Sequence, residues 1–166
     1  MQGVCARSRL RMQWHATWTM TLVKASMAQV TSASRRGEIL LIEDRDEVRE
    51  GLAQLLELHG FMVTEVDDAG VGMRELTARP QGFALVLLDL LIGDAMDGVG
   101  FRRDQLADPE LAAVPTIVIT ASDIAAPDRV PLHTDGWLEK PFRFDALLEL
   151  VKRYVVPEGG GLTASE

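Results

Sequence analysis

The chain has 166 residues, 47% of them hydrophobic, so we expect one globular domain with a sizeable core and no second domain within this length. Its formal charge is -8 at pH 7, and the acids all lie after residue 37. An acidic domain repels nucleic-acid phosphates, so we expect no direct DNA binding, and no apolar run is long enough to span a membrane. The single cysteine excludes an internal disulfide and favours a reducing, cytoplasmic compartment.

Residues 1–37 are basic and contain no acid. We expect them to be a disordered extension or the product of a misassigned start, with Met20 or Met27 as the true beginning. The globular domain is then expected at residues 38–156, followed by a disordered, glycine-rich tail at 157–166.

Short apolar runs alternate with segments of helical periodicity after residue 37, which is typical of βα units around a parallel sheet. The third run is the most apolar and should be central, whereas the second suits an edge. We therefore predict an α/β fold, a doubly wound three-layer sandwich with strand order 2-1-3-4-5. The strands are expected at residues 39–42, 61–66, 83–88, 116–119 and 137–138.

Helical periodicity follows each strand. The second helix should start at an Asp68 cap and stop before Pro80, and the third should span residues 98–107. The fourth, within residues 121–135, contains two prolines, each of which removes a backbone donor, so it should be short or broken. Apolar stripes mark the first helix (Val48, Leu52, Leu55, Leu56) and the last (Phe144, Leu147, Leu148, Val151).

Polar residues interrupt the apolar runs at the carboxyl ends of the strands, where open α/β sheets bind ligands. In the predicted order four of these strands are consecutive neighbours, about 4.8 Å apart, so their polar side chains can converge. These residues are Glu43 and Asp44 after the first strand, Asp89 after the third, Thr120 after the fourth and Lys140 after the fifth.

Three converging carboxylates repel one another and require a cation. Mg²⁺, or Mn²⁺, prefers oxygen ligands, which Asp44 and Asp89 supply. Lys140 offers a point charge and Thr120 a hydroxyl to phosphoryl oxygens. In that setting the carboxylate of Asp89 is a nucleophile that forms an acyl phosphate.

Each of these residues also has an ordinary structural interpretation. Asp44 with Glu47 resembles a capping box, Thr120 suits any strand, and a tryptophan such as Trp137 most often serves packing. Asp89 is the hardest to explain structurally, because a carboxylate at the end of a buried strand needs a partner.

Together, the motifs resemble those of response-regulator receiver domains of two-component signalling, which have a flavodoxin-like (βα)₅ fold. No single segment is specific, but their order and spacing match over residues 38–154. The matching segments are ILLIED at 39–44, LVLLDL at 85–90, MDG at 96–98, VPTIVITA at 114–121 and WLEKPF at 137–142.

The resemblance implies that Asp89 is phosphorylated from a histidine kinase or a histidine phosphotransfer protein, and that Lys140 binds the phosphoryl oxygen. It implies that an acid pair, Glu43 and Asp44, binds the metal with Asp89 and the backbone carbonyl of Leu91. It also casts Thr120 and Trp137 as a switch pair. The residues of these implied roles are all present in the sequence.

A receiver of this kind would be no enzyme beyond its own phosphorylation and dephosphorylation. It would signal by docking to a downstream protein that the sequence does not identify, or as a homodimer through the face of the fourth helix, fifth strand and fifth helix.

The sequence departs from the family pattern in three places. The loop from Asp89 to Gly98 is one residue longer than usual, with Gly93-Asp94 where proline-glycine is common. Arg45 follows the acid pair, where an acid or a small polar residue is common. The stretch between the fourth and fifth strands is short and contains two prolines.

Other functions remain open at this point. A haloacid-dehalogenase-like phosphatase also uses an aspartate after an apolar strand, but it needs a second aspartate where Leu91 stands. An interaction module that has lost the phosphorylation chemistry is the main alternative, although the five polar residues are retained. Nucleotide binding is disfavoured, because acids rather than glycines follow the first strand.

Overall fold

The computed structural model describes residues 36–93, 98–121 and 132–157. Within these ranges, five parallel strands form one sheet in the order β2-β1-β3-β4-β5. This confirms the predicted fold class and strand order. The strands are β1 (Glu38–Ile42), β2 (Val63–Val66), β3 (Phe83–Leu88), β4 (Thr116–Ala121) and β5 (Gly136–Lys140).

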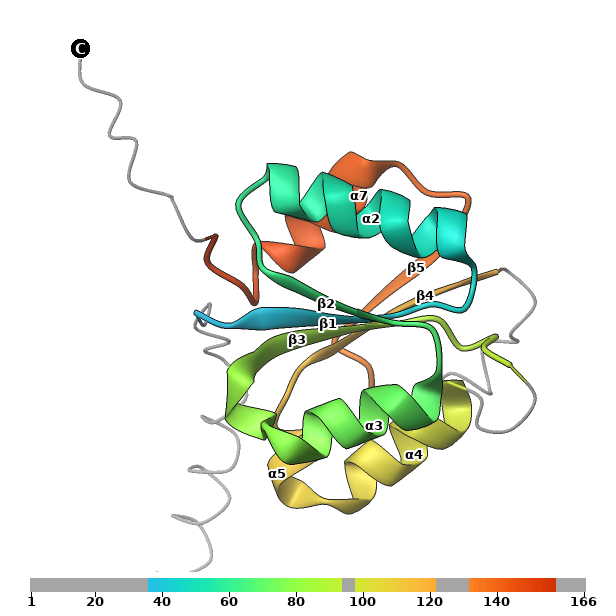
Figure 1. Ribbon diagram of the computed structural model, residues 1–166, viewed down its shortest axis with the longest axis vertical. Coiled ribbons are helices and arrows are strands. Elements are labelled where there is room, and N and C mark those ends of the chain that lie inside the picture. Colours follow the sequence, from blue (N-terminus) through green and yellow to red (C-terminus); the bar gives the residue numbers. More distant parts are fainter. Residues whose placement is uncertain (1–35, 94–97, 122–131, 158–166) are drawn as a thin grey trace, which may run out of the picture. The chain divides into compact units, whose positions relative to one another are not determined.

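Helices cover both faces of the sheet, as Figure 1 shows. One layer contains α2 (Asp46–Leu58) and α7 (Phe144–Val151). The opposite layer contains α3 (Ala69–Ala78), α4 (Gly98–Ala107) and the short α5 (Pro109–Ala112). A 3₁₀ turn, η1 (Pro80–Gly82), joins α3 to β3.

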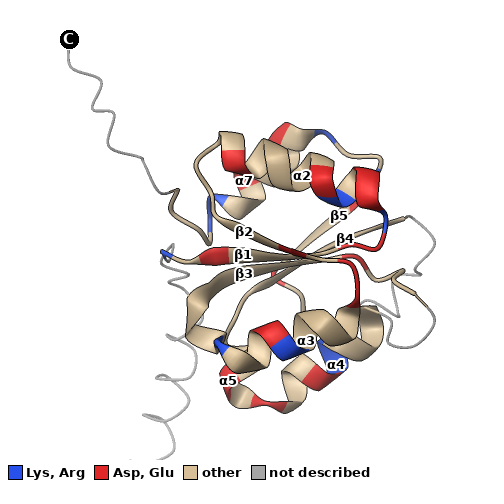
Figure 2. Cartoon of the chain, in the orientation of Figure 1, with Lys and Arg blue, Asp and Glu red and all other residues tan. Residues whose placement is uncertain are grey.

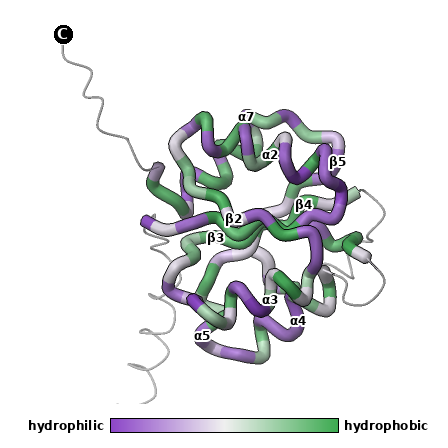
Figure 3. The backbone as a smooth tube through the Cα atoms, in the orientation of Figure 1, coloured by the Kyte–Doolittle hydropathy of each residue, from purple (hydrophilic) through white to green (hydrophobic). Residues whose placement is uncertain are grey.

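The core is split by the sheet into two apolar clusters, one beneath each helical layer. Every residue of β3 is buried, as expected for a central parallel strand with helices on both faces. Figure 3 shows the hydrophobic colour along the central strands β3 and β4, between the two helical layers. Because β3 is apolar throughout, its last residue, Leu88, is buried, and so is Asp89, which follows it at the carboxyl end of the sheet.

Several helix predictions are confirmed. Asp68 caps α3 by accepting a hydrogen bond from the backbone of Val71, and α4 spans the predicted residues 98–107. Asp108 ends α4 but also caps α5, because Pro109 has the fixed φ that suits a first helical position. The predicted fourth helix falls within 121–135, most of which lies outside the described residues.

Strand bounds and one core position differ from the predictions. The second strand starts later, at Val63, and β5 is longer than its two most apolar residues indicated. Thr120 consequently lies within β4, and Lys140 is the last residue of β5. Leu55, predicted in the apolar stripe of the first helix, is 40% exposed, and the buried face of α2 is instead formed by Leu52, Ala53 and Leu56.

Arg102 on α4 is a buried basic residue whose role the sequence did not indicate. Its side chain donates to the carbonyls of Leu132 and His133 and to the side chains of Gln105 and Thr116. The hydroxyl of Thr116 in turn donates to the side-chain oxygen of Gln105. The network ties α4 to the base of β4 and to the chain that leads into β5.

Among the described residues, no helix has the length and apolar character needed to cross a membrane.

Candidate functional site

The register of β1 and β3 brings the predicted acids together. Ile42 pairs with Leu88, and the residues that follow, Glu43 and Asp89, lie side by side at the carboxyl end of the sheet. The backbone N–H of Asp89 donates to the carbonyl of Ile42, which extends the pairing by one residue. The strand-end argument from the sequence is therefore confirmed for this pair.

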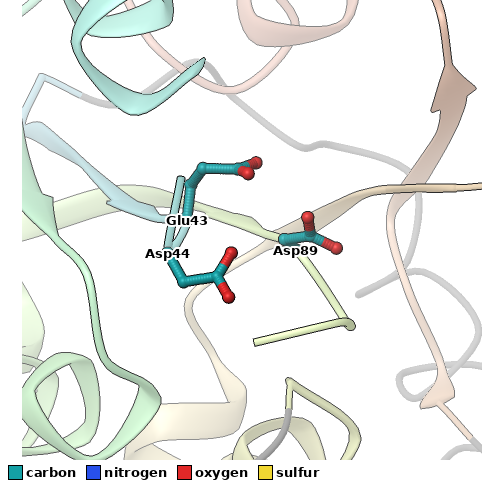
Figure 4. Close-up of side chains that lie close together, drawn as sticks. All are labelled: Glu43, Asp44 and Asp89. Carbon is teal, nitrogen blue, oxygen red and sulfur yellow. The ribbon is translucent and has the colours of Figure 1, made fainter. Parts of the chain in front are cut away.

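Three carboxylates converge at this edge, as Figure 4 shows. Glu43, Asp44 and Asp89 each offer an oxygen, and these oxygens lie within 4.8 Å of one another. Glu43 is 1% exposed and Asp89 4%, whereas Asp44 faces solvent. Figure 2 shows further acidic positions at the start of α2, beside the same edge.

Lys140 lies between two of the three acids. Its ammonium donates to Oδ2 of Asp89 at 2.7 Å and also to Oε2 of Glu43. The side chain of Lys140 is only 14% exposed. Because β5 is separated from β1 by two strands, this contact depends on the full 2-1-3-4-5 order.

Two arginines, one in the turn after β1 and one in α2, contact Glu43. The Nε of Arg45 donates to Oε1 of Glu43 at 3.0 Å, and this hydrogen bond raises the pKa of Arg45 above its usual value. Arg49, one turn further along α2, donates to the backbone carbonyl of Glu43 at 3.1 Å and to Asp46. The sequence flagged Arg45 but not Arg49, whose position one helical turn later was the available signal.

The acids do not serve as helix caps. The N-cap position of α2 is occupied by Arg45 and not by Asp44, and the Arg45 side chain makes no capping hydrogen bond. The capping-box interpretation of Asp44 is therefore wrong. Asp44 instead has a long contact, 3.4 Å, with the backbone N–H of Gly93 in the loop after β3. Its carboxylate remains exposed at the mouth of the cluster.

The backbone after β3 fixes the position of Asp89. The N–H of Leu91 donates to Oδ1 of Asp89 at 2.9 Å, and Gly98 packs against the carbonyl of Asp89. A Cβ on Gly98 would stand 2.1 Å from that carbonyl oxygen, so only glycine fits there. The role predicted for the Leu91 carbonyl stays a prediction, and residues 94–97 of the lengthened loop lie outside the described residues.

The predicted switch residues lie on neighbouring strands. Trp137 on β5 pairs with Val118 on β4, two residues before Thr120, so both side chains project from the same face of the sheet. Thr120 is completely buried, and its hydroxyl has no hydrogen-bond partner in the described part of the chain. Trp137 is partly buried against the cluster beneath α3 and α4. Their switching role stays a prediction.

The fold and this strand-end arrangement define a receiver-like α/β protein, and comparison with known proteins gives its family. A family model described as the response regulator receiver domain matches residues 39–152. The chain therefore belongs to the response regulator receiver domain family, as the sequence motifs predicted.

Curated relatives and solved structures agree with this family. The transcriptional regulatory protein GltR of Pseudomonas aeruginosa is 34% identical over 137 residues, covering 77% of this chain and 55% of that protein. A response regulator receiver protein from Pseudomonas putida has 27% identity and a TM-score of 0.62, over 72% of this chain and 98% of that one.

A third similarity concerns the fold alone. The response regulator TrrA of Thermotoga maritima, solved in complex with Mg²⁺ and BeF, has 22% identity and a TM-score of 0.63, over 72% of this chain and 99% of that one. The curated relatives are longer than the region they share with this protein. The chain spans about half of GltR and of the Bacillus subtilis protein YkoG, at 55% and 50% of their lengths.

Proposed function

We propose that this chain is a phosphoaccepting receiver in a two-component phosphorelay and that Asp89 takes the phosphoryl group. The observation that carries the proposal is the contact of the Lys140 ammonium with the Asp89 carboxylate, beside Glu43 and Asp44. A buried carboxylate with a lysine and two further acids at the carboxyl edge of a doubly wound sheet is a ligand site rather than core.

In the proposed reaction, an oxygen of Asp89 attacks the phosphorus of the donor. The bond from phosphorus to the donor's leaving group, a histidine nitrogen, breaks as the acyl phosphate forms. The Leu91 N–H holds Oδ1 of Asp89, which orients the carboxylate, and Lys140 neutralises charge on the phosphoryl oxygens. The buried hydroxyl of Thr120 is available to donate to another of those oxygens.

Mg²⁺, or Mn²⁺, fits the donor set of this site. The three carboxylates of Glu43, Asp44 and Asp89 offer only oxygen atoms, which hard divalent cations prefer, and Asp44 is open to solvent. These residues would hold the cation, which supplies charge neutralisation at the phosphoryl group. The backbone carbonyl of Leu91 is a further proposed ligand.

The proposed partners are a histidine kinase or a histidine phosphotransfer protein on the input side and a protein that binds the phosphorylated form on the output side. The chain would act in the cytoplasm and catalyse only its own phosphorylation and dephosphorylation. The GltR relative is named a transcriptional regulatory protein. For this acidic chain, net charge -8, we propose signalling by protein docking or homodimerisation through β5 and its flanking helices, without direct DNA contact.

The direct test is labelling with acetyl phosphate and Mg²⁺, followed by intact-protein mass spectrometry. Wild-type protein should gain one phosphoryl group, and Asp89→Asn should gain none, because the amide is not a nucleophile. Asp145→Asn removes an exposed carboxylate paired with Arg143 and serves as the matched control, which should label normally. Undiminished labelling of Asp89→Asn would refute the assignment.

An interaction module that needs no phosphorylation is the remaining alternative. Pull-downs with and without an acyl-phosphate mimic separate the two functions, with Asp89→Asn as the control in both arms. A receiver should capture a partner in one state only, and the variant should not respond to the mimic. Equal capture in both states would favour the interaction module.

A further inference from the structure

Arg45 occupies an oxygen of the proposed metal site. Its Nε donates to Oε1 of Glu43, while Lys140 donates to Oε2, so both oxygens of this carboxylate contact a positive side chain. The two cations differ in freedom, since the side chain of Arg45 is 55% exposed and that of Lys140 only 14%. Arg45 can therefore leave Glu43 for solvent without opening the core.

The neighbouring Arg49 is held differently. Its guanidinium bonds to the backbone carbonyl of Glu43 and to the side chain of Asp46, and it is 14% exposed. It therefore makes no hydrogen bond to the Glu43 carboxylate. Of the two arginines, only Arg45 contacts oxygens that a cation would use.

The net formal charge of the cluster indicates in which state Arg45 stabilises the site. Glu43, Asp44 and Asp89 carry three negative charges, and Lys140 with Arg45 supplies two positive ones, leaving the cluster one charge negative. A divalent cation added with Arg45 in place makes it one charge positive, and departure of Arg45 makes it neutral. Conversion of the Asp89 carboxylate to a dianionic acyl phosphate adds one negative charge, which Arg45 can then neutralise.

We propose that Arg45 competes with the divalent cation for the Glu43 carboxylate, so that the resting site binds Mg²⁺ weakly and the phosphorylated site binds it more tightly. This rests on the proposed receiver function. Arg45 acts on the site through charge and through its contact with Glu43, and it is a positioning residue rather than a catalytic one. Phosphorylation and Mg²⁺ binding thereby become more strongly coupled than the carboxylates and Lys140 alone would make them.

Isothermal titration with MgCl₂ tests the resting state. Arg45→Gln removes the charge at similar length and should lower the dissociation constant about fivefold at low salt, an effect that shrinks as salt screens the charge. Arg45→Lys keeps the charge and should stay close to wild type. The matched control is Arg103→Gln, which removes the same charge from an exposed pair with Asp104 on α4 and should change nothing.

The coupling between phosphorylation and Mg²⁺ binding is tested by repeating the titration with beryllium fluoride. This mimic adds to Asp89 the negative charge that phosphorylation would add. The mimic should tighten Mg²⁺ binding more in wild type than in Arg45→Gln. Equal dissociation constants for wild type and Arg45→Gln in the resting state would overturn the inference while leaving the proposed function intact. Absence of Mg²⁺ binding in every variant would overturn the inference together with the proposed metal site, whereas acetyl phosphate labelling of Asp89 reports separately on the receiver function.

Discussion

Lys140 is a partly buried basic residue and Arg102 is a buried one, and their charges are stabilised in different ways. Lys140 contacts two carboxylates at the carboxyl edge of the sheet. Arg102, 2% exposed, donates to two backbone carbonyls and to the uncharged side chains of Gln105 and Thr116. Burial lowers the pKa of Arg102, although a guanidinium stays charged in a protein.

We therefore expect that another cation can replace the charge of Lys140, whereas the charge of Arg102 cannot be replaced in this way. The carboxylates that contact Lys140 can also be neutralised by another cation, because attraction between opposite charges does not require a particular positive group. The acceptors of Arg102 are dipoles at set positions, which only a planar group with several donors can satisfy at once. We therefore expect the site around Lys140 to respond to added ions and the network around Arg102 to be insensitive to them.

The largest expected effect follows from replacing Arg102. Arg102→Met leaves the carbonyls of Leu132 and His133 without this donor and removes one of the two donors to Oε1 of Gln105, so the free energy of unfolding should fall by about 3–5 kcal/mol. Urea unfolding measures this, with Arg103→Met on the same helix as an exposed control. Added Mg²⁺ should restore none of the loss. A loss below about 1 kcal/mol would show that the network is not structurally important.

Replacing Lys140 should have a smaller and reversible effect. Lys140→Met leaves three neighbouring carboxylates with less positive charge, which should cost about 1–3 kcal/mol in unfolding free energy. Mg²⁺ should recover part of this loss, since a ligand that binds only the folded state stabilises it. Thermal unfolding with and without MgCl₂ measures the recovery. If Mg²⁺ rescued Arg102→Met as well as Lys140→Met, the distinction between the two regions would fail.

Replacing Asp89, the proposed phosphoacceptor, should change the stability of the fold very little. Asp89→Asn removes one of three mutually repelling charges, while its side-chain oxygen can still accept from the Leu91 N–H or from Lys140. We expect a change in unfolding free energy within about 1 kcal/mol, in either direction. Denaturant midpoints of wild type and variant measure it. A large destabilisation would mean that Asp89 is a structural residue held by Lys140, against the exchangeable character of the site.

The strand ends of the site could be predicted from the sequence, because each polar residue interrupts an apolar run and parallel strands share one edge. Asp89 after the fully buried β3 is the clearest case. The order of the strands turned these positions into neighbours, and the structure confirms the order and the contact of Lys140 with Asp89.

What the sequence could not supply depends on side chains meeting across the fold. Arg102 occurs within a helix of ordinary polar appearance, and its four acceptors come from its own helix, β4 and the approach to β5. Arg45 was noticed as unusual, but its contact with Glu43, two residues earlier, depends on side-chain orientations that the sequence does not give. The fit of Gly98 against Asp89 depends on backbone distances that no sequence pattern contains.

A third kind of charge, partly exposed and paired, should give the smallest effect. Arg79 hydrogen-bonds to Glu38 and Thr64 at the opposite end of the sheet and lies over the ring of Phe83. The hydrogen bond from Arg79, with a smaller contribution from Thr64, lowers the pKa of Glu38 below 4.5.

Because the folded-state pKa of Glu38 is lowered, its contribution to stability is present above the unfolded value near 4.5 and disappears as the pH falls through the folded value. Arg79 is 40% exposed, so solvent screening limits the loss in Arg79→Gln to about 1 kcal/mol or less at pH 7. The difference from wild type should shrink toward pH 3 in urea unfolding, whereas an Arg103→Gln control should differ equally at both values. A difference that stays constant with pH would show that Arg79 stabilises through its contact with Phe83 and not through its charge.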